Sequence, residues 1–257
     1  MLGKLLKYDL KWVYKLVVVY YGLAIIFALV GRGLSFIDNS FIFEFISKFS
    51  CGVSVAMVFN ILINNIIRLW VRYINNIYKD ESYLTHTLPV KKEEIYLSKV
   101  LTAVITMFTS IVVVAISLYI CYWSNDLIDF IKMLLPGFSW SVVILTIFVL
   151  IFEFMFLIFL GYLAITIGYR SNQGKLVKSF LSGFIIYAVS SFMSLLILFI
   201  VGLFNSNILD LFKTANPIVS VDILNFILLI ALVLYLVYIV LCNVISCKLL
   251  TRGVNVD

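Results

Sequence analysis

Three observations on the sequence predict an all-α polytopic membrane protein with six transmembrane helices. Of its 257 residues, 64% are hydrophobic and only 12% are charged, about half the charged share of typical soluble domains. Its mean hydropathy is +1.15, whereas a soluble fold of this size buries only about three quarters of the surface that its unfolded chain exposes. Its apolar residues gather in long segments. These features exclude a soluble enzyme, a disordered chain and a nucleic-acid-binding protein as first interpretations.

The apolar segments approach or exceed the roughly 20 residues that a helix needs to cross a bilayer. The predicted spans are residues 16–34, 45–67, 100–122, 138–168, 179–204 and 223–247. The first is too long, and lacks the small-residue cleavage site, for a removed signal peptide. No linker, low-complexity tract or soluble-sized segment interrupts the pattern, so residues 1–257 are expected to form a single transmembrane domain.

An even number of spans places both termini on one side of the membrane, and the basic residues predict which side. Fifteen of the 19 lysine and arginine residues fall on the side of the termini. They are Lys4, Lys7, Lys11, Lys15, Arg68, Arg72, Lys79, Lys91, Lys92, Lys99, Arg170, Lys175, Lys178, Lys248 and Arg252. Arg32, Lys48, Lys132 and Lys213 fall on the other side. Because cytoplasmic loops carry the excess of lysine and arginine, both termini are predicted to be cytoplasmic.

Residues 1–15 are predicted to form an amphipathic interfacial helix. At about 100° per residue, the four lysines of this segment fall in one narrow stripe, and leucines, Trp12 and Val13 occupy the opposite face. Such a helix lies along the membrane surface, with its lysines toward anionic headgroups and Trp12 at the boundary. Asp9 points from the apolar face, where a carboxylate needs a partner. We expect Asp9 to pair with a basic residue of segment 68–99 or of a partner protein, and to couple this helix to an element that moves.

Residues 68–99, between the second and third spans, form the longest polar stretch. The second span is predicted to continue past the membrane as a basic, aromatic helix that ends in a turn at 79–82. A new helix is expected to begin near Pro89, a residue that suits the first turn of a helix. Glu93 and Glu94 would then fall in its first turns, where the helix dipole favours anions.

Between these two helices, Tyr83, Leu84 and Leu88 are expected to form an apolar patch in a cytoplasmic loop. Apolar residues ringed by charge indicate a docking surface. The alternative is that the patch packs against the protein's own helices.

Two segments of the chain carry a family resemblance: LLKYDLKW at residues 5–12, and YLTHTLPVKKEEIYLSK at residues 83–99, which leads into the third span. Together with the six-span layout, they resemble the permeases of bacterial ABC-2 type transporters, the membrane subunits of type V ABC exporters. The Leu-Pro-Val step followed by basic residues is typical of that family, whereas six spans alone are not specific.

The resemblance implies a role for each segment. Residues 1–15 match the connecting helix, and 68–99 match the coupling region, which sits in a cleft of the ATPase subunit. The matched connecting-helix residues are Lys4, Lys7, Asp9, Lys11 and Trp12. The matched coupling residues are Tyr83, Leu84, His86, Leu88, Pro89, Lys91, Lys92, Glu93 and Glu94.

The resemblance also implies partners. These would be two copies of an ABC ATPase subunit, a second permease chain (identical or homologous) and membrane lipids, in the bacterial plasma membrane. ATP and Mg²⁺ would be cofactors of the ATPase, and this chain would be a transport subunit rather than an enzyme. The nearest match to a phosphate loop, Gly168 to Leu176, has one residue too many and leucine in place of Ser/Thr.

The sequence offers no metal site. Its one histidine, His86, is expected in a cytoplasmic loop, and its four cysteines have no CxxC spacing. An intramembrane metalloprotease is therefore disfavoured, because it needs several zinc ligands and a water-activating carboxylate. The cysteines are interpreted as free thiols; a disulfide between Cys51 and Cys121, near the outer ends of their spans, is the alternative.

Polar residues within the spans are candidates for a substrate pathway or for helix packing. Ser139, Thr146 and Glu153 recur every seven residues along span four. Glu153 is expected either to be protonated and hydrogen-bonded within the bundle, or to line a cavity and meet a cationic group of the cargo, because an unpaired charge at that depth is costly. In span two, Asn60 and Asn64 (beside Asn65) would form hydrogen bonds between helices or line the pathway.

Span five carries a stripe of small and hydroxylated residues. The stripe comprises Gly183, Tyr187, Ser190, Ser191 and Ser194. Small residues let helix backbones approach closely, so this stripe is interpreted as a helix-packing face or a dimer seam.

The favoured function is the membrane subunit of an ATP-driven exporter that moves an amphipathic substrate (a peptide, an antimicrobial, a drug or a lipid) out of the cytoplasm or the inner leaflet. A separate ATPase would drive its alternating access. The alternative is an ATP-independent secondary transporter or channel with Glu153 as an ion or proton site. That alternative predicts broken helices near the midplane, but Pro89, Pro136 and Pro217 all fall outside the middle of the spans. A membrane anchor for a sensory or immunity partner is a third possibility.

Overall fold

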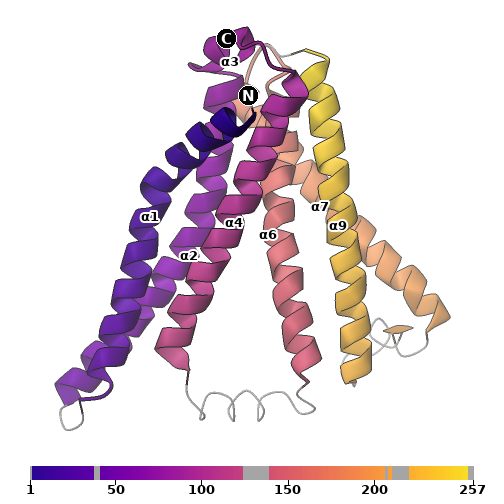
Figure 1. The fold of residues 1–257 in the computed structure, drawn as a ribbon. Helices are drawn as coiled ribbons and strands as arrows, with labels where there is room; N and C mark the ends of the chain where they lie inside the picture. Colours follow the sequence, from indigo (N-terminus) through magenta and orange to yellow (C-terminus); the bar gives the residue numbers. More distant parts are fainter. Residues whose placement is uncertain (1, 38–40, 124–138, 206–207, 210–219, 254–257) are drawn as a thin grey trace. The chain divides into compact units, whose positions relative to one another are not determined.

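The computed structural model describes residues 2–37, 41–123, 139–205, 208–209 and 220–253, and the regular elements within these ranges are helices (Figure 1). Six of them are long and apolar enough to cross a membrane, which confirms the predicted class of polytopic all-α protein. They are α1 (Leu2–Leu34), α2 (Phe41–Ile77), α4 (Lys92–Tyr122), α6 (Trp140–Gly168), α7 (Lys175–Phe204) and α9 (Val221–Thr251). A short helix, α3 (Ser82–Thr87), lies between α2 and α4.

The chain divides into two compact units, Met1–Asp129 and Phe130–Asp257. In the first, α1 packs against α2 and α4, which also contact each other. The α1–α2 contact is close because Gly31 has no side chain: a Cβ there would lie 2.5 Å from the Cys51 sulfur. Serines of α2 donate to α1 backbone carbonyls, from Ser47 to Gly31 at 2.7 Å and from Ser54 to Ala24 at 2.9 Å. Small residues and interhelical hydrogen bonds thus hold this seam, as is usual in membranes.

Hydroxyl groups connect α4 to its two neighbours. Tyr21 of α1 shares a 2.8 Å hydrogen bond with Ser110 of α4, and the Asn65 amide of α2 donates to the same serine at 3.2 Å. Within the described residues, Asn60 and Asn64 do not form the expected interhelical hydrogen bonds, because both amides donate to carbonyls of their own helix; the alternative that they line a pathway stays a prediction. Asn65 is the asparagine that faces a neighbouring helix.

In the second unit, α6 packs against α7 and α9. Phe156 of α6 contacts the ring of Tyr238 of α9, with 5.6 Å between centroids. A Cβ at Gly183 of α7 would lie 3.2 Å from the Ala164 side chain of α6. Among the described residues, α7 buries only Ser179 and Gly202, so α6 and α9 leave most of its apolar surface uncovered.

Two helix boundaries differ from the prediction. Residues 2–15 do not form a separate interfacial helix, because they are the first turns of the continuous helix α1. Helix α4 begins at Lys92 rather than near Pro89. The residue before a proline is driven out of the helical region, and Leu88 is extended, with ψ of 139°. Glu93 and Glu94 do lie in the first turn of α4, and α2 continues past its predicted span to Ile77, as expected.

Basic residues gather at one end of each unit. In the first unit, the start of α1, the end of α2 and the start of α4 meet at the end that carries Lys4, Arg68 and Lys92. In the second unit, Arg170 and Lys175 lie at the junction of α6 and α7. Lys132, Lys213, Pro136 and Pro217 lie outside the described residues. The cytoplasmic placement of the basic ends stays a prediction.

Candidate functional site

A charge cluster joins the four helices of the first unit at their basic end; we define it as Asp9, Arg72 and Lys99, which are buried, together with Glu81, whose side chain is 40% exposed. Asp9 of α1 is 2% exposed. Its Oδ1 accepts from Arg72 Nε of α2 at 2.8 Å, and both carboxylate oxygens accept from Lys99 Nζ of α4 at 2.7 Å. The Ser98 hydroxyl donates to Oδ2 at 3.2 Å. Asp9 is therefore paired with basic residues of segment 68–99, as expected.

Glu81 completes the cluster on the side of α3. Arg72 Nη1 donates to the two Glu81 oxygens at 2.8 and 2.6 Å, and the Asn76 amide donates to Oε2 at 3.0 Å. The cluster thus holds two carboxylates and two cations, and its formal charges cancel. Removing one of the three buried members, Asp9, Arg72 or Lys99, leaves an uncompensated buried charge, which costs more than the intact group contributes.

Helix α3 is fixed to the end of α2 by short contacts. Glu81 directly precedes α3 and accepts from Arg72 of α2, and within α3 the Thr85 hydroxyl donates to the Glu81 backbone carbonyl at 2.9 Å. His86 Nε2 lies 3.1 Å from the Ile77 carbonyl oxygen of α2. These contacts hold the outward face of α3 in a defined position relative to the charge cluster.

The outward face of α3 carries the predicted apolar patch. Tyr83 is 74% exposed, Leu84 73% and Leu88 39%, and we name these three residues the α3 surface. The expectation that they are exposed is confirmed, and within the described part of the first unit they do not pack against its helices. Pro89 and Lys91 are exposed in the following connection.

The remaining coupling residues begin α4. Lys92, Glu93 and Glu94 form its first turn. The positive end of the helix dipole stabilises the two carboxylates there. Glu93 is exposed, whereas Lys92 and Glu94 are half-buried. The predicted coupling residues therefore occupy one continuous stretch from α3 to the first turn of α4.

The connecting-helix residues separate into an exposed stripe and a covered face. Lys4, Lys7 and Lys11 are all exposed, as the amphipathic pattern predicted. Trp12 is half-buried, and the guanidinium of Arg68 lies 4.6 Å from its ring centroid, with that of Arg72 at 5.6 Å. The structure thus brings Asp9 and Trp12 to the charge cluster and leaves the lysines outside it.

Glu81 and Ser98 were not predicted to belong to this site. A weak signal was available, because Arg72 and Asn76 are four residues apart on one helix and so face the same side. Neither the short helix α3 nor the position of Glu81 directly before it could be read from that spacing.

The predicted polar line of α6 does not form one site. Ser139 caps the helix by accepting from Ser141 N at 3.3 Å, and the Thr146 hydroxyl donates to the Val142 carbonyl of its own helix. Glu153 is half-buried and forms no hydrogen bond or ion pair within the described part of the chain; it interacts electrostatically with Tyr235 of α9.

The stripe on α7 serves helix packing within the chain. The Tyr238 hydroxyl of α9 donates to the Ser190 carbonyl at 3.1 Å and shares a 3.0 Å hydrogen bond with the Ser194 hydroxyl. Beside this contact lies a pocket of about 350 Å³ that Tyr187 and Ser191 also line. The helix-packing interpretation is confirmed at Gly183, Ser190 and Ser194, whereas a dimer seam stays a prediction.

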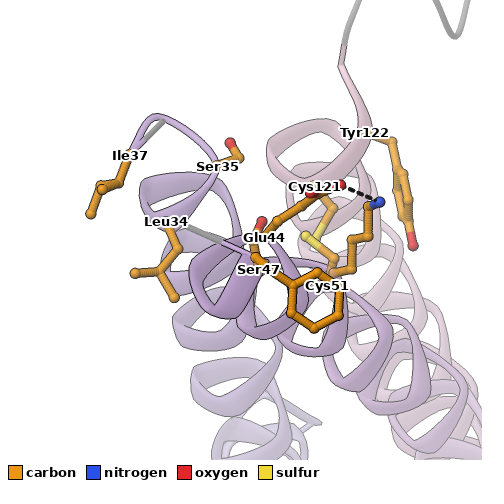
Figure 2. A pocket seen from close by; sticks show the side chains of 10 residues that line it. Leu34, Ser35, Ile37, Glu44, Ser47, Cys51, Cys121 and Tyr122 are labelled. Atoms are coloured by element: carbon orange, nitrogen blue, oxygen red, sulfur yellow. Dashed lines mark hydrogen bonds and ion pairs between the residues drawn. The ribbon is translucent and has the colours of Figure 1, made fainter. Parts of the chain in front are cut away.

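A second pocket, of about 700 Å³, lies at the end of α1, the start of α2 and the end of α4, at the opposite end of the first unit from the charge cluster. Its wall contains the ion pair of Glu44 and Lys48 at 2.6 Å, and the thiols of Cys51 of α2 and Cys121 of α4 (Figure 2). Both cysteines are free, and their side chains contact each other.

Comparisons of the chain with protein-family models, with curated proteins and with solved structures gave no match. The functional interpretation therefore rests on the sequence and on the geometry of the described residues.

Proposed function

We propose that the chain is the membrane subunit of an ATP-driven exporter and that its α3 surface docks onto a separate ATPase. The observation that carries this proposal is the combination of an exposed apolar α3 surface with the charge cluster directly behind it. An apolar patch outside the predicted spans has no lipid to cover it, so a protein partner is the natural occupant.

The charge cluster gives that surface a mechanical connection to the membrane helices. Glu81, next to α3, binds Arg72 of α2, which in turn binds Asp9 of α1, and Asp9 binds Lys99 of α4. A displacement of α3 therefore reaches the basic ends of three long helices through charged contacts of 2.6 to 2.8 Å. In the proposed mechanism, ATP closes a pair of ATPase subunits, α3 moves with them, and the helices change between inward-open and outward-open states.

The proposed cargo is amphipathic and enters from the cytoplasm or the inner leaflet. The resemblance to ABC-2 type permeases supports this class, and so does the shortness of the segments expected outside the membrane. A second permease chain, identical or homologous, completes the proposed transporter, and the exposed apolar face of α7 is a surface on which it could pack.

Co-purification tests the proposal. The tagged chain is solubilised gently from its native membrane, and its partners are identified by mass spectrometry. We expect a stoichiometric partner with an intact phosphate loop, and we expect Leu84→Asp together with Leu88→Asp to release it. Thr87→Asp is the matched control, because it adds a charge to the same exposed short helix and removes no apolar side chain.

A chain that purifies alone, under conditions that preserve other transporter–ATPase complexes, would contradict the proposal. The second candidate, an ATP-independent transporter or channel, would then be favoured. Glu153 supports that candidate, because it forms no hydrogen bond or ion pair within the described residues. Proton-coupled uptake into proteoliposomes that Glu153→Gln abolishes would be its signature.

A further inference from the structure

A groove between α1 and α2 is lined by two cations, two aromatic residues and two aliphatic residues. We name it the α1–α2 groove; its lining comprises Trp12, Lys15, Leu16, Val19, Tyr20 and Arg68. Its volume of about 450 Å³ is within the range of small-molecule sites. It lies on a different side of α1 from Tyr14 and Tyr21, which contact α4.

Among the residues that the structure describes, the two cations of the groove have no counter-ion. Asp9 is the one acidic residue of α1, and it is already paired with Arg72 and Lys99. Glu44 is the one acidic residue of α2, and it pairs with Lys48 in the first turns of that helix, far along α2 from Arg68. Within the described residues, neither Lys15 nor Arg68 forms an ion pair.

Arg68 also has an unsatisfied donor. Its Nε is buried and has no hydrogen-bond partner among the described residues, although the guanidinium lies against the Trp12 ring. Burying a charged donor without a partner is costly. The residue as a whole is half-buried, and a guanidinium fork is well suited to bind a phosphate group.

The level of the groove along the predicted spans favours a lipid headgroup as the group that carries the phosphate. Lys15 directly precedes the first predicted span, 16–34, and Arg68 directly follows the second, 45–67. Both cations therefore lie where lipid headgroups meet the chain, and Trp and Tyr are enriched at that level. Val19, which is 58% exposed, starts an apolar wall that runs on into the span.

We propose that the α1–α2 groove binds the headgroup of an anionic phospholipid, with the phosphate between Lys15 and Arg68 and the acyl chains along Leu16 and Val19. The site is separate from the α3 surface, and it does not depend on whether an ATPase binds the chain.

Native mass spectrometry of the detergent-purified full chain tests the site with dioleoylphosphatidylglycerol and, for comparison, dioleoylphosphatidylcholine. We expect selective retention of the anionic lipid. Arg68→Gln and Lys15→Gln should each weaken its binding about five-fold, the effect expected of one basic residue near an anionic surface. Lys15 is exposed, so its replacement does not threaten the fold.

Lys11→Gln is the matched control, because Lys11 is an exposed lysine of the same helix that does not line the groove. Unchanged binding in this variant supports a defined site, whereas an equal loss in all three variants would show diffuse attraction and overturn the proposal. Equal retention of the two lipids would also overturn it. Displacement of the anionic lipid by millimolar inorganic phosphate would refute the lipid as the occupant, because the acyl chains would then add nothing.

Discussion

Asp9→Asn tests how much the charge cluster contributes to stability. Asp9 is 2% exposed and is the ion-pair partner of Lys99, which is itself 3% exposed. The substitution keeps the size of the side chain but removes its charge, so Lys99 becomes a buried cation with no counter-ion. Breaking a buried pair in this way costs about 3–5 kcal/mol. We expect the free energy of unfolding to fall by that amount when it is measured by steric trapping in bicelles.

A second substitution separates charge imbalance from lost packing. Lys99→Met leaves Asp9 with Arg72 and Ser98 as partners, so it should cost less, about 1–3 kcal/mol. In the double variant no unpaired charge remains, and replacing a buried pair by apolar groups is often neutral. The Asp9→Asn, Lys99→Met chain should therefore be more stable than the Asp9→Asn chain, in spite of carrying one more change.

The matched control is Asp80→Asn, an identical chemical change at an exposed position beside Glu81. Surface substitutions of this kind usually stay within about 0.5 kcal/mol. A loss below about 1 kcal/mol for Asp9→Asn, or a double variant that is no better than this single one, would refute the argument from an uncompensated buried cation.

Three further predictions concern the helix seams. Gly31→Ala should destabilise the chain by about 1–3 kcal/mol in the same assay, because the added Cβ would lie 2.5 Å from the Cys51 sulfur; Gly33→Ala meets nothing within 4 Å and should be tolerated. Mild oxidation with diamide should link Cys51 to Cys121 within one chain, seen as the loss of two hydrogens in the intact mass; thiols that both remain open to alkylation would contradict this. Tyr238→Phe removes two hydrogen bonds to α7 and should cost about 1 kcal/mol, so an unchanged stability would show that those bonds contribute nothing.

The class of fold and the exposure of the amphipathic stripe could be predicted because each depends on a local pattern. Apolar length fixes where a helix crosses the bilayer, and a 3.6-residue period fixes which lysines share a face. The buried state of Asp9 was likewise predictable, since a carboxylate on an apolar face requires a partner. That partner was expected in segment 68–99, and the structure supplies Arg72 and Lys99.

The details that could not be predicted depend on contacts between helices distant in the sequence. Asn60, Asn64 and Asn65 are the same residue type in the same span, so the sequence does not distinguish them. Only the packing of α2 against α4 shows that Asn65 faces Ser110. The start of α4 at Lys92 depends on the extended backbone around Pro89, which no apolar period records. The docking of α3 on α2 likewise depends on Glu81 reaching Arg72 in three dimensions.

Because α1 is one continuous helix, a rotation at one of its ends displaces the other end. Asp9 and Gly31 are separated by 22 residues of one unbroken helix, a length of about 33 Å at 1.5 Å per residue. A tilt of about 10° about Asp9 would move Gly31 sideways by about 6 Å. A small change of angle at the charge cluster therefore becomes a larger displacement at the far end of the helix. There Gly31 lies against Cys51 of α2, beside the pocket of about 700 Å³. The width of that pocket would thus respond to small movements of α1 at its basic end.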